Sequence, residues 1–460
     1  MRFVVDIIGV MQITRSRGCI TGSIVVPSSK SYLQRAIAAG AMAEGVTRLH
    51  YKTLCEDAQA AIRVARALDA EVWVGPSLLE IRGSRQLAGH WTNGRESAPG
   101  GVGAHDDSRR VEQNAEQSAE LLLPCGESGL CMRMFAPIAA LLGRTAILEA
   151  QGSLCKRPMG VLQTVLPEFG VKVDTEEGHA PVRLSGKLHG GNLCLDASES
   201  SQVLTGLLLA LPLTAEQSIL SVVNPTSRGY LDLTISVCAR FGVRIRRDRD
   251  YSKFIIPGNQ RYQATDLAVE GDWSAGAFLV VMGAIAAKEE GLLIQGLDLG
   301  STQPDKAILA AARSAGAKIA AKEEGFIVRK GRLKAFRFDA TDCPDLFPPL
   351  VVLAAAAPGR SVIKGVHRLR GKESDRAQSL VAMLDSLGGS AHVEDDCFVV
   401  DGKALHGGMI DPNNDHRIAM AAEAASLITY GEITICDSDC VDKSWPGFFE
   451  DINSIKVNPT

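Results

Sequence analysis

A repeated unit constrains the fold of this chain more than any other feature of its sequence. A short pattern, a helix ending in Gly followed by a strand, begins at Phe169, Phe241, Ala315 and Leu387, with gaps of 72, 74 and 72 residues. A related stretch begins at Leu68, 101 residues before Phe169. Gly favours the left-handed backbone that ends a helix, so each copy predicts a helix, a turn and a strand.

A second pattern runs in step with the first. Apolar runs of helical length, each with a polar start, follow one another after gaps of 97, 72, 73, 72 and 70 residues. Because these runs are apolar on nearly all sides, they predict buried helices. The N-termini of buried helices present free N–H groups and positive dipole ends, so six of them together would form an anion-binding cleft. The runs begin near Ser31, Ser128, Ser200, Trp273, Asp345 and Asp415.

The six units predict an α/β protein with two similar domains. Each unit holds two helices, one amphipathic and one apolar, together with short strands such as VRLSG, FIVRK and CFVVD. Three units make a domain of ordinary size, whereas 460 residues are too many for one core. The cleft is therefore expected between the two domains.

An insertion interrupts the first half of the chain. The two gaps that exceed the period both place it between Leu68 and Ser128. Residues 89–117 are polar, rich in Gly and without apolar periodicity. They predict a mobile surface loop, with a functional lid as the alternative.

Composition narrows the class of protein. The net charge is −4 and no long basic run occurs, which argues against nucleic acid as the main partner. The 11 Cys lack metal-ligand spacing, so they are expected to be reduced thiols of a cytoplasmic protein, with Cys436 and Cys440 as a metal pair the minor alternative. No apolar stretch reaches about 20 residues, so no membrane span is expected. The N-terminal run FVVDIIGVM is interpreted as a strand rather than a signal peptide.

Charged residues gather at the starts of the apolar helices. Lys30 and Arg35 lie near a helix start, where cations oppose the helix dipole and are better explained by a bound anion. In the second unit Gly129 would let a ligand approach the backbone. Taken alone, GKESDR reads as a solvated helix start and His416 as a capping or core histidine. The repeated register favours a site, because the same position of each unit supplies cations, Ser or carboxylates.

The chain resembles the EPSP synthase (3-phosphoshikimate 1-carboxyvinyltransferase) family in several segments, in the family's order. These are VPSSKSYLQRA, SESSQVLTGLLLALPL, EGDWSAGAF, GKESDRAQSLVAMLDSLGG, NNDHRIAMA and DKSWPGFF. The resemblance implies the enolpyruvyl transferase fold, an inside-out α/β barrel whose two domains each contain three βαβαββ units. It places residues 29–269 in one domain, which holds most shikimate 3-phosphate contacts. Residues 1–28 and 270–460 form the other, with most catalytic carboxylates and phosphoenolpyruvate contacts.

The same resemblance implies a reaction. The family transfers the enolpyruvyl group of phosphoenolpyruvate to the 5-hydroxyl of shikimate 3-phosphate, with no metal and no organic cofactor. The two substrates together carry roughly five to six negative charges near neutral pH, since a phosphate's second pKa is about 6. Their contact needs several Arg and Lys, and the transfer needs a base at the hydroxyl and an acid at the methylene carbon. A monomer with these small-molecule partners is expected.

The resemblance also assigns residue roles. Asp345 matches the group that takes the 5-hydroxyl proton, Glu373 matches a proton shuttle at the methylene carbon, and Lys30 and His416 join them as catalytic candidates. The shikimate 3-phosphate contacts implied are Ser31, Arg35, Ser200, Ser201, Gln202, Ser227, Tyr230 and Lys372. The phosphoenolpyruvate contacts implied are Lys30, Gly129, Arg157, Arg376, Arg417 and Lys443.

Several residues depart from the family's pattern, among them Gly371 for the usual Val and Gly229 for the usual Pro. Glu127 stands where Asn is usual, Leu130 where Thr is usual, and Arg368 where Asn is usual. One alternative is the related UDP-N-acetylglucosamine 1-carboxyvinyltransferase family, whose members have Lys-Asn where this chain has Lys30 and Ser31. A non-catalytic anion-binding relative is the other, and the presence of Lys30, Asp345 and Glu373 argues against it.

Overall fold

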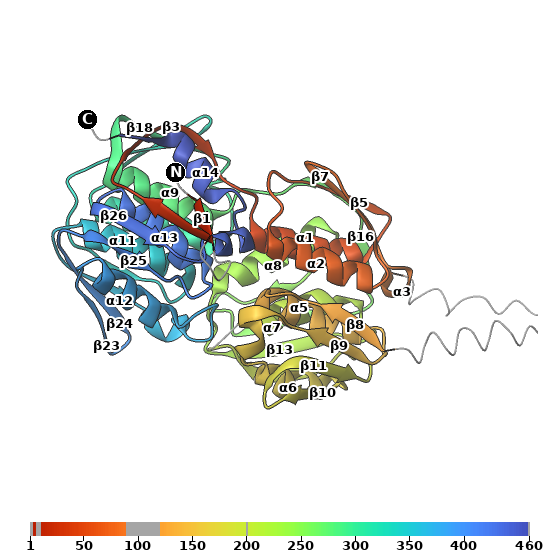
Figure 1. Cartoon of the computed structure of the whole chain (residues 1–460). Helices are drawn as coiled ribbons and strands as arrows, with labels where there is room; N and C mark the ends of the chain where they lie inside the picture. Colours follow the sequence, from red (N-terminus) through yellow and green to blue (C-terminus); the bar gives the residue numbers. More distant parts are fainter. Residues whose placement is uncertain (1–2, 6–10, 89–119, 199–200, 459–460) are drawn as a thin grey trace, which may run out of the picture.

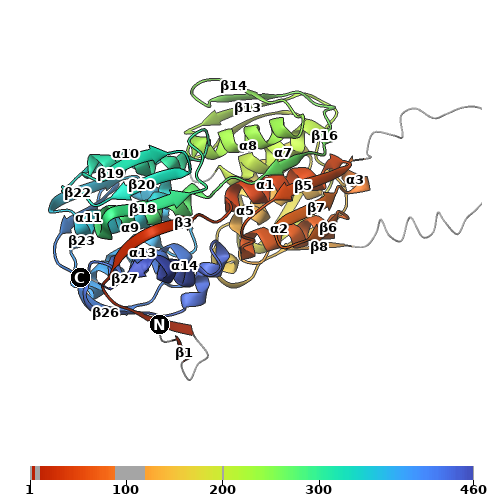
Figure 2. The ribbon, with the colours of Figure 1, turned by 90° about the horizontal axis from the view of Figure 1, so that it is seen from above.

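The chain folds into two lobes (Figures 1 and 2). Each lobe has its own hydrophobic core. The computed structural model describes residues 3–5, 11–88, 120–198 and 201–458, so the predicted insertion at 89–117 lies outside the described residues. One core runs from Tyr32 to Tyr262, and the other joins the stretch around Ile13–Val26 to residues from Trp273 to Ile455. We call the elements around these cores the first and second lobes.

Six sheets share one strand order. In each, a first strand pairs in parallel with a second strand, which pairs antiparallel with a third, and the third pairs antiparallel with a fourth. One sheet of the first lobe has the order β17(Asp266–Ala268)-β5(Val46–His50)-β7(Leu78–Arg82)-β6(Glu71–Val74). A second has the order β8(Leu121–Pro124)-β9(Ala146–Glu149)-β11(His179–Ser185)-β10(Lys172–Glu176). The third has the order β12(Asn192–Asp196)-β13(Ser218–Val223)-β15(Lys253–Ile256)-β14(Arg246–Arg247). A small parallel pair, β16(Tyr262–Gln263) with β4(Ala43–Glu44), completes it.

The second lobe repeats the same order three times. One sheet has the order β3(Cys19–Val25)-β18(Ala287–Gln295)-β20(Gly325–Arg329)-β19(Lys318–Lys322), with β27(Lys456–Val457) added beside β3. A second has the order β21(Arg337–Asp339)-β22(Gly359–Lys364)-β24(Cys397–Gly402)-β23(Ala391–Glu394). The third has the order β25(His406–Ile410)-β26(Tyr430–Ile435)-β2(Met11–Arg15)-β1(Phe3–Val5). The N-terminal run predicted as a strand supplies β1 in its described part. Six equivalent sheets are the structural form of the repeat seen in the sequence.

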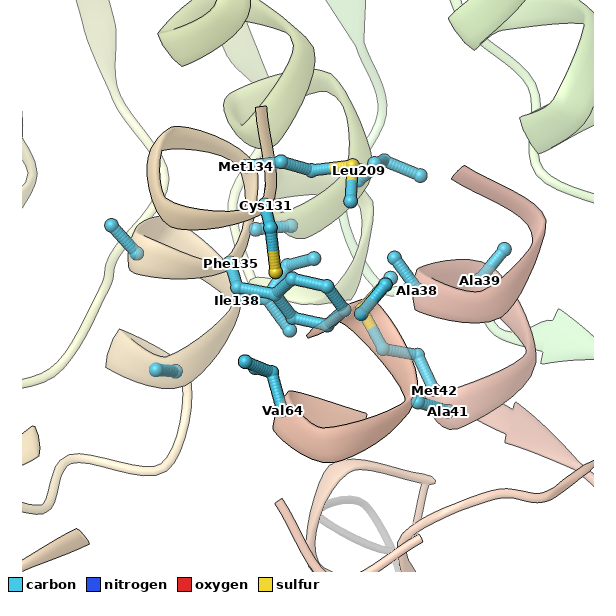
Figure 3. Close-up of a cluster of buried hydrophobic side chains, with 14 of the residues drawn as sticks. Ala38, Ala39, Ala41, Met42, Val64, Cys131, Met134, Phe135, Ile138 and Leu209 are labelled. Atoms are coloured by element: carbon cyan, nitrogen blue, oxygen red, sulfur yellow. The ribbon is translucent and has the colours of Figure 1, made fainter. Parts of the chain in front are cut away.

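The apolar runs form the buried helices of both lobes. Every residue of α9 is buried, and α5, α7, α11 and α13 are buried along nearly their whole length. Figure 3 shows Phe135 and Ile138 of one such helix packed among side chains of its neighbours. All six begin within two residues of the predicted starts, which confirms that prediction. The six are α1 Lys30–Ala41, α5 Gly129–Ala140, α7 Gln202–Ala210, α9 Trp273–Ala286, α11 Phe347–Ala356 and α13 His416–Ser426.

The outer helices end where the sequence predicts. Gly170, Gly242, Gly316 and Gly388 follow them with φ of 83°, 83°, 100° and 69°, and Asp69 takes the same left-handed backbone with φ of 69°. Each turn then leads into an edge strand, as predicted. These helices are α2 Glu56–Ala67, α6 Gly160–Val165 with η3 Leu166–Phe169, α8 Arg228–Arg240, α10 Ile308–Ser314 and α12 Arg376–Ser386. Two further helices, α3 Arg85–Ala88 and α14 Phe448–Ile455, lie outside the repeated pattern.

The chain crosses between the lobes twice, and the two crossings touch. Ser28 forms a bridge with Gly271, and the Ser29 N–H donates to the Glu270 carbonyl at 2.8 Å. Asp272 caps α9 through the Ala275 N–H at 2.9 Å, and its other oxygen accepts from the Lys30 N–H of α1 at 3.0 Å. One carboxylate therefore holds the N-termini of a helix from each lobe side by side.

Within the described residues, no helix is long and apolar enough to cross a membrane.

Candidate active site

A cavity of about 840 Å³ lies between the lobes, where the helix N-termini meet. Its wall holds eight Lys or Arg against four Asp or Glu, although the whole chain has a net charge of −4. The cavity is therefore a local basic site in an acidic protein. The predicted site residues that line it are Lys30, Ser31, Arg35, Gly129, Arg157, Ser201, Gln202, Ser227, Tyr230, Asp345, Lys372, Glu373 and Arg417.

Three predicted residues that the structure describes are not in this wall. Arg376, His416 and Lys443 are buried beside it without lining it. Ser200 lies outside the described residues. The structure thus brings most of the predicted site together and places three of its members behind the wall.

Two buried arginines of the first lobe bond to neutral groups. Arg35 donates from Nε to Thr234 Oγ1 at 2.9 Å and from Nη1 to the Ser31 carbonyl at 2.7 Å. Arg133 donates to Gln202 Oε1 at 2.8 Å and to the Pro158 carbonyl at 2.7 Å. Burial lowers the pKa of Arg35 to about 10 and that of Arg133 to about 9. Their positive charge is left for an anion to neutralise.

Lys30 is paired with a carboxylate that the sequence reasoning did not single out. Its Nζ lies 3.0 Å from Asp57 Oδ2. Burial alone would lower the pKa of Lys30, but Asp57 raises it above its ordinary value, so the ammonium stays charged. Asp57 stands in the first turn of α2, and that acidic helix start is the signal that could have found it.

Gly129 makes room for a side chain of the site. A Cβ placed on it would lie 2.7 Å from the Arg157 guanidinium carbon. The sequence predicts that Gly129 lets a ligand approach the backbone, and in the structure Arg157 occupies that approach. Arg157 Nε also donates to the Gly371 carbonyl of the second lobe at 3.1 Å. The glycine therefore allows a cation to lie flat against the start of α5 and reach across the cleft.

Arg376 joins three carboxylates of the second lobe. Its Nε donates to Asp415 Oδ2 at 2.8 Å, its Nη1 to Asp345 Oδ1 at 2.7 Å and its Nη2 to Glu373 Oε2 at 2.6 Å. The side chain is 1% exposed. Since each nitrogen meets a different acid, the guanidinium fixes both predicted catalytic carboxylates in place.

Asp345 and Glu373 are both ionised in this arrangement. Burial alone would raise the pKa of Asp345, but Arg417 at 3.1 Å and Lys372 at 3.6 Å hold it well below its usual range. Arg376 and Arg157 do the same for the pKa of Glu373 against its burial. Asp345 can therefore accept a proton as it stands, whereas Glu373 must first take one up before it can donate.

His416 is a buried residue of the first turn of α13. It is 1% exposed, and neither ring nitrogen has a hydrogen-bond partner among the described residues. Burial, with Lys30 and Arg417 nearby, lowers the pKa of His416 well below its usual value, so the ring is neutral.

Asp305 is a second acidic residue that the sequence reasoning missed. It is fully buried, and its Oδ2 accepts from the Tyr230 hydroxyl at 2.9 Å and from the Ser274 hydroxyl. Burial and the charge of Asp345 raise the pKa of Asp305 to about 6. Pro304-Asp305 repeats the helix-start dipeptide Pro344-Asp345, and that repetition was the available signal.

Arg368 crosses from the second lobe to the first. It lies in η7 (Val366–Leu369) and donates to the Ser198 carbonyl at 2.6 Å and to Ser227 Oγ at 2.8 Å. Leu130, another departure from the family's pattern, lines the cavity beside Gly129. Both departures are therefore part of the cavity wall.

Comparisons with known proteins agree on one family. The family model described as EPSP synthase (3-phosphoshikimate 1-carboxyvinyltransferase) matches residues 103–452. A 3-phosphoshikimate 1-carboxyvinyltransferase of Clostridium novyi (strain NT) is 32% identical over 438 residues, which cover 95% of each chain. One of Methanocorpusculum labreanum is 33% identical over 447 residues, covering 97% of this chain and 98% of the relative. A solved structure of EPSP synthase from Acinetobacter baumannii superposes with a TM-score of 0.76 at 25% identity, covering 97% of this chain and 98% of that chain.

Proposed function

The chain belongs to the EPSP synthase family, and we propose that the cavity between its lobes is where that family's reaction takes place. The enzyme transfers the enolpyruvyl group of phosphoenolpyruvate to the 5-hydroxyl of shikimate 3-phosphate. The products are 5-enolpyruvylshikimate 3-phosphate and phosphate. The reaction belongs to the shikimate pathway, which leads to chorismate and the aromatic amino acids.

The charge of the cavity is the observation that carries this proposal. Eight cationic side chains face four carboxylates in its wall, which leaves an excess of four positive charges. The two substrates together bring roughly five to six negative charges near neutral pH. Binding both substrates therefore offsets the whole positive excess of the wall and leaves roughly one to two negative charges in the filled site.

Each substrate is assigned its own set of contacts in this proposal. Shikimate 3-phosphate binds mainly to the first lobe, where Arg35 has neutral partners and Tyr230 and Ser227 face the same cavity. Its remaining contacts are Ser31, Ser200, Ser201, Gln202 and Lys372. Phosphoenolpyruvate binds among Lys30, Gly129, Arg157, Arg376, Arg417 and Lys443.

Asp345 and Glu373 supply the proton transfers. Asp345 takes the proton of the 5-hydroxyl group while the oxygen of that hydroxyl bonds to C2 of phosphoenolpyruvate. Glu373 gives a proton to the methylene carbon. Elimination reverses the second transfer: the methyl group returns a proton to Glu373 and the bond from C2 to the phosphate oxygen breaks. The leaving phosphate takes up the proton held by Asp345, which restores both carboxyl groups. An anionic substrate that draws Arg157 and Arg376 away from Glu373 would raise its pKa and allow it to carry that proton. Lys30 stabilises the negative charge, and a direct role for His416 stays a prediction.

The lobes correspond, in this proposal, to two domains, one of residues 29–269 and one of residues 1–28 and 270–460. The contacts of Arg157, Arg368 and Tyr230 across the cleft are those of a closed form. Substrates that bind both walls would favour closure from a more open state. Small-angle scattering with saturating shikimate 3-phosphate should show compaction, and an unchanged radius of gyration would contradict it.

The enzyme is expected to be a cytoplasmic monomer. None of its 11 cysteines forms a disulfide, as expected in a reducing compartment. Light scattering of the purified protein tests the monomer, for which about 49.0 kDa is expected.

One assay tests the function. Phosphate release from phosphoenolpyruvate is measured with shikimate 3-phosphate and, in parallel, with UDP-N-acetylglucosamine. Turnover with the first acceptor and none with the second is expected. Turnover with UDP-N-acetylglucosamine would move the chain to the related transferase, and release with neither acceptor would favour a non-catalytic anion-binding protein.

A further inference from the structure

The Glu127 carboxylate is bound by four donors on one oxygen. Its Oε2 accepts from the Ser153 N–H at 3.0 Å and from the Ser153 hydroxyl at 2.8 Å. It also accepts from Asn414 Nδ2 at 3.0 Å and from Lys443 Nζ at 2.9 Å. Four convergent donors define a built site for a negative charge.

The donors come from both lobes. Ser153 belongs to the first lobe, as Glu127 does, whereas Asn414 and Lys443 belong to the second. Lys443 Nζ also donates to the Asn414 carbonyl at 2.7 Å. Glu127, Asn414 and Lys443 therefore form a closed ring of hydrogen bonds across the cleft. The backbone leaves space for this ring, because a Cβ on Gly152 would lie 2.4 Å from the Glu127 carboxyl carbon.

Glu127 is held as an anion. Its own burial would raise its pKa, but the bonds from Lys443 and Ser153 lower the pKa below its ordinary value. Neither Glu127 nor Lys443 lines the cavity. The charge pair therefore lies behind the wall and acts on the cavity through its neighbours.

Asn414 connects this pair to the cavity. Asn413 and Asn414 have left-handed backbones, with φ of 53° and 56°, directly before α13. Asp415 then caps α13 through the Arg417 N–H at 3.0 Å and accepts from Arg376 at 2.8 Å. The turn is thus held by Glu127 from the first lobe and by Arg376 from the second.

Arg417 follows this turn and reaches the cavity. Its Nη2 lies 3.1 Å from Asp345 Oδ2, and its side chain forms part of the wall. A shift of the turn would move both Arg417 and the ammonium of Lys443. Both are assigned to phosphoenolpyruvate under the proposed function, on which this inference rests.

We propose that Glu127 is a positioning residue for phosphoenolpyruvate binding. Its carboxylate fixes Lys443 and Asn414 across the cleft, so that Arg417 stands at the cavity wall when the lobes are closed. A neutral amide at this position would keep the shape of the side chain but lose the charge that holds Lys443. The effect is expected in the use of phosphoenolpyruvate and not in that of shikimate 3-phosphate, whose contacts lie elsewhere.

The test compares Glu127→Gln with wild type in steady-state kinetics. Loss of a charge-assisted contact should raise the KM for phosphoenolpyruvate about tenfold and leave the KM for shikimate 3-phosphate within about twofold. The control is Asp342→Asn, which removes an exposed ion pair with Arg228 at 3.9 Å between the same two lobes. That control should leave both KM values unchanged. An unchanged or lowered KM for phosphoenolpyruvate in Glu127→Gln overturns the proposal.

A double-mutant cycle separates positioning from general stabilisation. In a Lys443→Met background, Glu127→Gln should change the KM for phosphoenolpyruvate by less than about threefold, because the partner it acts through is gone. Equal effects in both backgrounds overturn the proposal. If Glu127→Gln does not fold, Ser153→Ala removes one donor from the same oxygen and should raise the same KM about twofold to threefold.

The outcome of the cycle is distinct from that of the proposed function. A wild-type protein that releases no phosphate contradicts the proposed function. A wild-type protein that turns over while its Glu127→Gln variant is indistinguishable from it contradicts this inference alone.

Discussion

Buried arginines on the two sides of the cavity stand in opposite electrostatic surroundings, with Arg35 and Arg133 on one side and Arg376 on the other. In the first lobe, Arg35 and Arg133 bond to hydroxyls, carbonyls and an amide among the described residues, and burial lowers the pKa of both. In the second lobe, Arg376 meets three carboxylates. Burial alone would lower its pKa as well, but Asp415 and Glu373 raise it well above the ordinary value.

This difference separates binding from chemistry. A buried cation without a counter-ion costs free energy that a bound anion returns, so the first wall is completed by its ligand. Arg376 is neutralised by carboxylates of its own lobe, and the catalytic carboxylates that it holds are already oriented before substrate arrives. Changes on the second wall should therefore damage rate or fold, and changes on the first should damage affinity.

The largest effect is expected from Asp345→Asn on the second wall. Loss of the group that takes the hydroxyl proton should lower kcat by about 10²- to 10⁴-fold. The KM for shikimate 3-phosphate should change far less. Stopped-flow measurement of phosphate release gives both values, and a kcat within tenfold of wild type would remove Asp345 as the base.

Arg376→Met should show the structural cost of the paired wall. The substitution leaves the buried Asp415 and the half-buried Asp345 and Glu373 without their shared cation, which should destabilise the fold by about 3–5 kcal/mol. Urea unfolding of the substrate-free protein measures it. Arg35→Met, also a buried arginine, is the matched control and should cost clearly less. An equal loss in free energy of unfolding for the two variants would contradict the contrast between the two buried arginines.

Arg35→Met should instead weaken binding. A charge-assisted hydrogen bond contributes about 1.5–3 kcal/mol, so the affinity for shikimate 3-phosphate should fall roughly tenfold to a hundredfold. Isothermal titration of the ligand into both proteins provides the comparison. An unchanged dissociation constant would remove Arg35 from the site.

The smallest effect concerns Asp305, which lies between the walls. Its pKa of about 6 exceeds the unfolded value near 3.9, so the folded state binds this proton more tightly. The stability that it contributes is present below about pH 4 and is lost as the pH rises through about 6. Asp305→Asn should therefore gain about 1–2 kcal/mol over wild type between pH 4 and pH 7. A pH-independent difference in urea unfolding would show that Asp305 does not titrate in this range.

Local patterns in the sequence predicted the helices but not their partners. A cap such as Ser29, Ser128 or Asp415 stands next to the apolar run that it starts, so one short stretch defines the element. The repeat then predicted two similar halves with a cleft between them. Gly170 and its counterparts ended the outer helices for the same local reason.

Contacts across the cleft had no such signal. Tyr230 and Asp305 are 75 residues apart, and Glu127 and Lys443 are 316 apart. Nothing in either neighbourhood indicates the other, because the contact exists only after both lobes have folded and met. The sequence predicted that Gly129 lets a ligand approach the backbone. It gave no sign that Arg157 lies against this glycine, for the same reason.

The position of β3 in the sequence delays its pairing while the chain is being synthesised. This strand is complete once residue 25 has been made, yet its neighbours β18 and β27 are residues 287–295 and 456–457. The described strands of the first lobe, which are made in between, pair with one another, so this lobe can form its sheets at once. At about 5–20 residues per second, β3 waits roughly ten seconds to a minute for β18 as an unpaired edge. Such an edge invites pairing with other chains, so the yield of soluble protein should depend on translation speed and on chaperones that cover the first 28 residues.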